Sequence, residues 1–482
     1  MKIKTNGVFV DIFWSFFQRG GSLIISFVSN MVLARLLTPD DFGCVGIIMI
    51  FVSFADLLVD SGLAGALIQK KNITQNDINT VFTTNFAISV FIYILIFVTA
   101  PFLAVYFKIQ NLDVYLRVVS ISILLRAFFI VQSADLMKRL QFKRISIYGI
   151  ITTAGGVIVA IIMALYGFGV WSLVAKNIVQ PLLSALLYGL GSPVSGKFGF
   201  DTQSFKQLFG FGWFVMLTAF LDLLYTNTIA FIVGKRYTVK DLGYYNQANS
   251  LQQVPTYSLA MVIKQVLFPY MARIYDDKDL MKEYSQRVMI VSTFAIFPIM
   301  MYLISFAQPL VVLLYSSKWL PSAIFFQILC IEGIVHSMIH INRQILKALG
   351  ETKLLFRIQL VVLAIGIVML LIAQKFSIIA LAWSLVVCSF INWVILAVIT
   401  GKRIVYSFGQ QIIDILPSFF VSTISIVSIR LLIGYFGLGP ILTLLFSGIL
   451  FLLLYLGVSF LLRTKGFKMT YAMCFNVSRM TK

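Results

Sequence analysis

The sequence predicts an all-α membrane protein that crosses the bilayer many times. Of its 482 residues, 60% are hydrophobic and only 12% are charged, and the mean hydropathy is +0.95. A soluble globular domain does not have this balance. Apolar runs of about 20 or more residues follow one another, and each is long enough to cross a membrane as a helix. Lipid offers the backbone no hydrogen-bond partners, so we expect helices rather than open strands. The alternating pattern of an outer-membrane barrel is absent.

About fourteen transmembrane helices are expected. Their predicted ranges are 11–37, 41–68, 80–106, 112–137, 145–166, 168–190, 205–234, 241–272, 286–315, 320–347, 353–374, 376–400, 411–434 and 439–462. The first apolar run is too long for the apolar region of a signal peptide, so we interpret it as a retained first span. Several ranges exceed about 20 residues, which favours helices that are tilted or that extend beyond the lipid.

The basic residues predict the orientation of these helices. If the N-terminus is cytoplasmic, the segments on the cytoplasmic side hold most of the Lys and Arg residues. The loops of the opposite side hold only Arg35, Lys108, Lys235, Arg236, Lys240, Lys318 and Lys375. The positive-inside rule therefore predicts that both termini are cytoplasmic. It also explains the net charge of +20 without nucleic acid as a partner.

A short pattern at the start of the second expected helix returns in the second half of the chain. Residues 38–43 are TPDDFG and residues 238–243 are TVKDLG. In the first copy, Thr38 is a predicted N-cap, Pro39 is the first helical residue, and Asp41 completes a capping box. A well-formed turn would explain either copy alone. Because the pattern recurs between similar apolar runs, we interpret it as evidence that one half of the chain is a duplicate of the other.

The duplication predicts how the chain is divided. Spans one to six and seven to twelve form two parallel six-helix repeats, because six is an even number and each repeat starts on the same side of the membrane. The predicted parts are an N-lobe at 1–190, a cytoplasmic linker at 191–204, a C-lobe at 205–400, two extra C-terminal spans within 401–463 and a cytoplasmic tail at 464–482.

Five stretches resemble bacterial polysaccharide flippases of the Wzx type, the variant that serves colanic acid, capsule or lipopolysaccharide (O-antigen) repeat units. They are residues 30–43 (NMVLARLLTPDDFG), 58–63 (LVDSGL) and 66–71 (ALIQKK), with later echoes at 167–174 (GFGVWSLV) and 346–350 (LKALG). The resemblance implies membership of the multidrug/oligosaccharidyl-lipid/polysaccharide exporter superfamily. In that superfamily two six-helix lobes surround a central cavity, and this chain has two further helices.

The resemblance also implies a function. The expected substrate is an undecaprenyl-diphosphate-linked oligosaccharide, which alternating access of the two lobes moves from the inner to the outer leaflet of the bacterial cytoplasmic membrane. The implied partners are this lipid-linked substrate, membrane lipid, and the polysaccharide polymerase and chain-length proteins of the same pathway.

Charged residues inside the expected spans are candidate site residues, because a charge in the membrane is costly and usually faces a cavity. A diphosphate needs cations, for which we predict Arg19, Arg126, Lys176, Lys264 and Arg343, with Asn246 as a sugar contact. The acidic candidates for ion or proton coupling are Asp56, Asp60, Asp222 and Glu332. Ser22, Ser26 and Ser29 continue a polar stripe from Arg19 at spacings of three and four. The alternative is that acids and bases pair within the bundle, as Asp56 or Asp60 with Arg19, and that the serines join helices.

The tenth expected span contains both histidines of the chain. Glu332, His336, His340 and Arg343 are separated by four, four and three residues, so they share one face of a helix. Buried carboxyl groups and histidines titrate near neutral pH, so we predict proton exchange there. The alternative is a self-satisfied polar ladder that only packs the helix.

The eighth expected span begins with a polar stretch that is rich in tyrosines and amides and includes Asn246. Such side chains suit sugar hydroxyl groups. A helix that projects beyond the lipid would have the same composition, and this alternative stays open.

Two other functional classes compete with flipping. A cation-coupled multidrug antiporter of the same superfamily would favour an acidic, aromatic cavity, whereas the deep charges here are mixed. A membrane glycosyltransferase or polymerase would need an acid–base or metal constellation, and the sequence has none. The four cysteines show no metal spacing. We therefore predict a protein that is not an enzyme and has no cofactor or metal.

Overall fold

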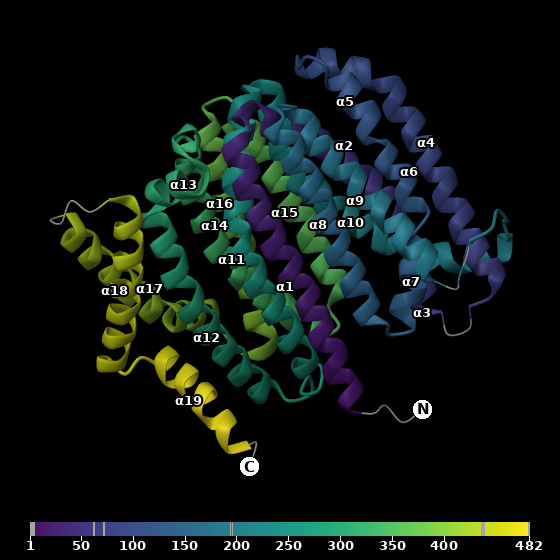
Figure 1. Cartoon of the computed structure of the whole chain (residues 1–482). Coiled ribbons are helices and arrows are strands. Elements are labelled where there is room, and N and C mark those ends of the chain that lie inside the picture. The colour runs from purple at the N-terminus through teal and green to yellow at the C-terminus, as the bar shows by residue number, and fades with distance from the viewer. Residues whose placement is uncertain are drawn as a thin grey trace. The chain divides into compact units, whose positions relative to one another are not determined.

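The computed structural model describes residues 5–60, 63–70, 73–192, 194, 196–434 and 439–480, which are helical with short connections (Figure 1). The helices are α1 (Thr5–Leu36), α2 (Pro39–Asp60), α3 (Leu63–Gln69), α4 (Gln75–Phe107), α5 (Leu112–Val119), α6 (Ile121–Ala127), α7 (Ile130–Lys138), α8 (Phe142–Leu165), α9 (Val170–Gly191), α10 (Thr202–Arg236), α11 (Val239–Met271), α12 (Lys278–Ser305), α13 (Ala307–Tyr315), the 3₁₀ turn η1 (Ser317–Trp319), α14 (Ser322–Ala348), α15 (Thr352–Ala373), α16 (Ile378–Ile404), α17 (Phe408–Gly434), α18 (Pro440–Leu461) and α19 (Lys465–Met480). The predicted all-α class is confirmed.

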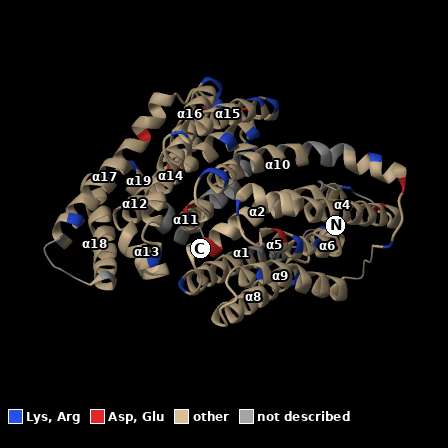
Figure 2. Cartoon of the chain, turned by 90° about the horizontal axis from the view of Figure 1, so that it is seen from above, with Lys and Arg blue, Asp and Glu red and all other residues tan. Residues whose placement is uncertain are grey.

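Each of the fourteen predicted ranges coincides with a helix or a run of helices. Among the described residues, ten helices are long and apolar enough to cross a membrane, and an eleventh is added if the pair bent by 40° at residues 128–129 counts as one span. The three other predicted ranges fall on α1, α10 and α11, which are 32, 35 and 33 residues long and include side chains outside the description. The count of fourteen stays a prediction. Figure 2 shows how sparse charged residues are along the helices.

Both copies of the repeated pattern form the predicted capping box. In the first copy the Thr38 amide donates to an Asp41 carboxylate oxygen at 2.8 Å, and the Asp41 amide donates to Thr38 Oγ1 at 3.3 Å. In the second copy the same two bonds join Thr238 and Asp241 at 3.2 and 3.1 Å. These bonds satisfy amides that a helix start leaves without partners. Helix α2 begins at Pro39, as the capping pattern predicts, and α11 begins at the corresponding residue of the second copy, Val239.

The chain separates by its internal contacts into two units, Met1–Asn246 and Gln247–Lys482. In the first unit α8 packs against α1 and α9, and α2 packs against α10. One apolar cluster of that unit joins three helices through Leu33 of α1, Leu37 directly after α1, Ala160 of α8 and Leu173 of α9. In the second unit α12, α14, α16 and α17 pack together, and α17 packs against α18. The division into lobes at residues 191–204 stays a prediction.

The segment between α9 and α10, within the predicted linker, is bonded to the first turns of α4. The amide of Gly199 donates to Thr83 Oγ1 at 2.9 Å, and the amide of Asp201 donates to Thr80 Oγ1 at 3.0 Å. Asp201 in turn caps α10 by accepting from the Ser204 amide at 2.8 Å. The start of α10 is therefore held in place against α4.

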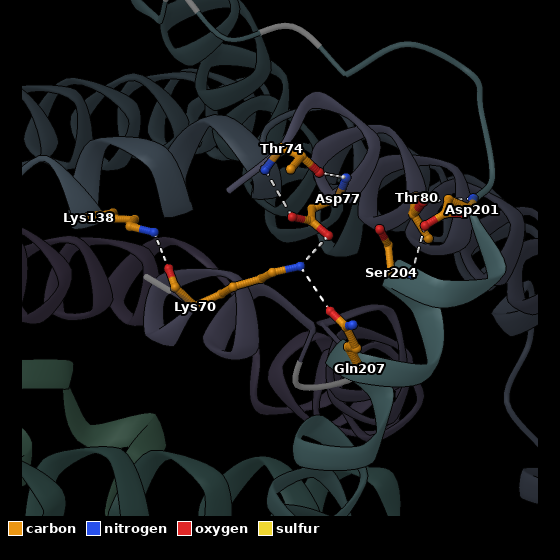
Figure 3. A network of polar contacts seen from close by, with 8 residues as sticks. All are labelled: Lys70, Thr74, Asp77, Thr80, Lys138, Asp201, Ser204 and Gln207. Atoms are coloured by element: carbon orange, nitrogen blue, oxygen red, sulfur yellow. Dashed lines mark hydrogen bonds and ion pairs between the residues drawn. The ribbon is translucent and has the colours of Figure 1, made fainter. Parts of the chain in front are cut away.

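A polar network beside this segment joins four helices (Figure 3). The Lys70 ammonium group, after α3, donates to the buried Asp77 of α4 at 2.8 Å and to Gln207 of α10 at 3.1 Å. Lys138, at the end of α7, donates to the Lys70 carbonyl oxygen. Asp77 also forms a capping box with Thr74, so this carboxylate serves both the helix start and the lysine. The network fixes the ends of α3, α4, α7 and α10 relative to one another.

Candidate functional site

A polar cavity of about 560 Å³ lies in the first unit among α1, α6, α8 and α9. Two of its lining residues are cations, Arg126 of α6 and Lys176 of α9. The other polar residues around it carry amides and hydroxyl groups: Gln18, Ser22, Ser26, Thr152, Thr153, Asn177, Gln180, Ser184 and Tyr188. The cavity is therefore cationic and rich in hydrogen-bonding groups, and it lies beside helices that are apolar enough to span a membrane.

The helical repeat explains why these side chains meet. Lys176, Gln180 and Ser184 are four residues apart, so they project from one face of α9. Gln18, Ser22 and Ser26 have the same spacing on α1. Both polar faces line the cavity, so Ser22 and Ser26 of the predicted serine stripe share it with Lys176.

Arg126 stands between this cavity and a second one of about 520 Å³, which it lines together with Asp56 and Asp60. Arg126 Nε lies 2.9 Å from an Asp56 carboxylate oxygen, and the two side chains are 42% and 20% exposed. The predicted alternative of ion pairing within the bundle therefore applies to Asp56. Because Arg126 keeps part of its surface open, it can contact a ligand while it is paired.

Lys176 differs from Arg126 in its charged surroundings. Among the side chains that the structure describes, no carboxylate pairs with the Lys176 ammonium group. A lysine ammonium group surrounded by helices is costly without an anion. This arrangement favours binding of an anionic ligand in the cavity.

The predicted polar face of α14 is present in the second unit. Glu332 accepts from Ser389 Oγ of α16 at 2.9 Å and lies 3.3 Å from His336 Nδ1. The His336 and His340 rings meet edge to face with their centroids 4.7 Å apart. Arg343 donates to Gln359 of α15. Glu332 and His336 thus pair as the ladder alternative predicts, while His336 remains 40% exposed.

Four further candidate residues are Asn246, Arg19, Asp222 and Lys264. The side-chain amide of Asn246 lies against Gly46 of α2, where an added Cβ would come within 1.9 Å of its Nδ2. Asn246 is therefore placed at a helix crossing. Arg19, Asp222 and Lys264 lie in α1, α10 and α11, but their side chains are outside the described residues. Their predicted roles stay predictions.

Several residues that line or support these sites were not predicted from the sequence. Thr152, Asn177 and Gln180 line the 560 Å³ cavity, and Ser389 holds Glu332. The four-residue spacing of Lys176 and Gln180 was a usable signal. No signal in the sequence links Ser389 to Glu332, since they lie on different helices. Among the described residues, no group of three or more His, Cys, Asp or Glu side chains could hold a metal ion.

The fold matches solved membrane transport proteins. The structure of the lipid II flippase MurJ in an inward closed conformation gives a TM-score of 0.78 at 17% identity, over 94% of this chain and 99% of that chain. An inward-facing multidrug resistance transporter of the MATE family gives a TM-score of 0.58 at 12% identity, over 80% and 94% of the two chains. The helices and the polar cavities therefore define a multi-pass membrane protein with a MurJ- and MATE-like fold.

The chain belongs to the polysaccharide biosynthesis protein family, whose model matches residues 32–324. This confirms the predicted resemblance to Wzx-type proteins.

Curated relatives include proteins of three polysaccharide systems. The succinoglycan biosynthesis transport protein ExoT of Rhizobium meliloti is 27% identical over 313 residues, which are 64% of this chain and 63% of ExoT. The teichuronic acid biosynthesis protein TuaB of Bacillus subtilis is 23% identical over 77% of this chain and 78% of TuaB. The lipopolysaccharide biosynthesis protein WzxC of Escherichia coli is 22% identical over 65% and 64% of the two chains. The chain thus matches just under two thirds of the length of ExoT and WzxC.

Proposed function

We propose that this protein flips an undecaprenyl-diphosphate-linked oligosaccharide repeat unit from the inner to the outer leaflet of the bacterial cytoplasmic membrane. Two lobes would expose the substrate site alternately to each side, with both termini in the cytoplasm. The product would feed the synthesis of lipopolysaccharide, capsule or exopolysaccharide. The protein itself would make or break no covalent bond.

This proposal depends most on one observation: two cations, Arg126 and Lys176, line the same polar cavity. Arg126 offers a planar fork that matches two phosphate oxygens, and Lys176 offers a compact charge that no described carboxylate pairs with. A diphosphate has enough charge to engage both groups. A neutral or cationic cargo would leave Lys176 uncompensated inside the bundle.

The rest of the cavity suits the sugar part of such a substrate. Gln18, Thr152, Asn177 and Gln180 supply donors and acceptors that can exchange partners with sugar hydroxyl groups. The relatives support the same class of cargo, because ExoT is named as a transport protein of succinoglycan biosynthesis and MurJ as a flippase of lipid II.

The remaining predicted residues complete the proposal. Arg19, Lys264 and Arg343 would add cations along the route, and Asn246 would contact sugar. Asp56, Asp60, Asp222 and the Glu332–His336–His340 group would couple the cycle to ions or protons. Polymerase and chain-length proteins would receive the flipped unit.

A cation-coupled multidrug antiporter is the second candidate. The 520 Å³ cavity favours it, since Asp56 and Asp60 line this cavity together with one arginine. Efflux of cationic dyes from vesicles that contain the purified protein would support this candidate, and we expect none above the rate of protein-free vesicles.

The proposal is tested by complementation in a strain that lacks this gene. We expect Arg126→Gln and Lys176→Met to abolish surface polysaccharide at normal protein levels, with lipid-linked repeat units accumulating in the cell. Arg357→Gln and Lys353→Met are matched controls, because both side chains are exposed on α15 and line neither of the two cavities described above. Full polysaccharide in both cavity variants would contradict the proposed site.

A further inference from the structure

A third cavity, of about 450 Å³, lies in the second unit. It is bordered by α17, by the junction of α18 and α19, and by Ile290 of α12. One wall is apolar, and Ile413, Phe420, Ile424 and Leu462 in it are each between 54% and 65% exposed. Apolar side chains with this exposure on spanning helices are suited to contact with lipid chains.

The end of this cavity at the α18–α19 junction is basic. Arg463, Thr464 and Lys465 line it in sequence, and Lys468 follows within the first turns of α19. Arg463 has a φ of 49°, which ends α18 and turns the chain into α19. Among the described side chains, Arg463 and Lys468 have no carboxylate partner. The cavity therefore joins an apolar wall to exposed cations.

One carboxylate, Asp414, faces the same cavity and is already engaged. It is buried, it accepts from the Tyr406 hydroxyl group at 3.0 Å, and it lies 3.8 Å from Lys465 Nζ. Burial, followed by the nearby Asp414 charge, raises the pKa of Tyr406, so the phenol stays protonated and keeps donating. Arg463 and Lys465 line the cavity against Asp414, and Lys468 follows on α19, so the end of the cavity stays positive.

We propose that this cavity binds one anionic phospholipid of the membrane. Its phosphate would accept hydrogen bonds from the Arg463 fork, the Thr464 hydroxyl group and Lys465, and one acyl chain would lie along Ile413, Phe420 and Ile424. Basic pockets beside spanning helices bind anionic lipid head groups in this way. A free phosphate would leave the apolar wall unused, and a zwitterionic lipid would gain little from the excess of cations.

Binding of fluorescent phosphatidylglycerol to the purified full-length protein tests this proposal. We expect the double variant Arg463→Gln/Lys465→Gln to bind this lipid about tenfold more weakly or worse, since both charge contacts with the phosphate are lost. The matched control Lys353→Gln/Arg357→Gln changes the net charge equally at two exposed positions of α15 and should bind as the wild type does. If the double variant does not give a monodisperse protein, Arg463→Gln alone should weaken binding by about threefold or more.

Competition separates the possible occupants. Unlabelled phosphatidylglycerol should displace the probe, while phosphatidylcholine and inorganic phosphate should not do so at the same concentration. The proposal is overturned by equal displacement with phosphatidylcholine, by displacement with inorganic phosphate, or by a double variant that binds as tightly as the control. Preferential displacement by undecaprenyl diphosphate would also overturn it and would assign the cavity to the transported lipid. These outcomes do not depend on whether the protein flips an oligosaccharide.

Discussion

Gly43 and Gly243 lie at the same position of the two copies of the repeated pattern, and each is in contact with the backbone of the other copy. A Cβ on Gly43 would lie 1.8 Å from the Val239 carbonyl oxygen, and a Cβ on Gly243 would lie 1.9 Å from the Pro39 carbonyl oxygen. The contact is reciprocal, as a local two-fold relation between duplicated segments requires. The first turns of α2 and α11 can cross this closely only because both residues lack a side chain.

Substitution at this crossing should therefore lower stability. We expect Gly43→Ala and Gly243→Ala each to lower the melting temperature of the purified protein, because an extra carbon in a packed contact costs about 1–3 kcal/mol. Gly189→Ala in α9 is the control, since nothing lies within 4 Å of its Cβ position. Alanine there should be neutral or stabilising. Equal melting temperatures for all three variants would show that the crossing is not tightly packed.

The buried Lys70–Asp77 pair should contribute more to stability than an exposed pair. Asp77 is fully buried. Asp77→Leu leaves Lys70 without its charge partner, and for buried pairs such a loss lowers the free energy of unfolding by about 3–5 kcal/mol. Glu283→Gln removes one partner of the exposed Glu283–Arg287 pair, for which about 0–1 kcal/mol is expected. Thermal unfolding of both variants compares the two. A smaller loss in the Asp77 variant than in the Glu283 variant would contradict this account of the network.

The Arg126–Asp56 pair distinguishes a ligand-binding role from a structural one. If Arg126 contacts the diphosphate, Arg126→Gln should abolish export and Arg126→Lys should impair it, because lysine lacks the bidentate fork. Asp56→Asn keeps Arg126 in place and should retain at least part of the export. The double variant Asp56→Leu/Arg126→Leu removes the pair without leaving a lone charge. If export is restored in this double variant, the pair only joins α2 to α6 and does not bind the substrate.

The helices were predictable from the sequence because each depends on local information. The long apolar runs locate the helices, and the Thr-x-x-Asp spacing indicates where α2 and α11 start. The partner of Asp56 was not predictable, since it depends on how α2 and α6 are rotated against each other. Arg19 was one predicted partner, whereas the structure pairs Asp56 with Arg126. The role of Gly43 was not predictable for the same reason, because only the fold brings Val239 close to it.

Glu332 should carry part of any dependence of export on external pH. Its contact with His336 is an ion pair only while the imidazole is protonated, so this contact can make export sensitive to pH. Glu332→Gln should reduce export and flatten its pH profile, and His336→Ala should do so less because Ser389 still holds the carboxylate. Ser389→Ala is the control for lost hydrogen bonding and should keep the pH profile. A Glu332→Gln protein with a normal rate and profile would leave this group a packing role.

Direct measurement of flipping tests the central claim. Purified protein is placed in liposomes with a labelled undecaprenyl-diphosphate oligosaccharide in one leaflet, and the label that reaches the other leaflet is measured over time. We expect transfer well above that of protein-free liposomes, with a rate at least about tenfold lower for Arg126→Gln/Lys176→Met, as loss of two charged contacts implies. Arg357→Gln/Lys353→Met should match the wild type. Wild-type transfer no faster than that of protein-free liposomes, or a cavity variant as fast as the wild type, would contradict the account.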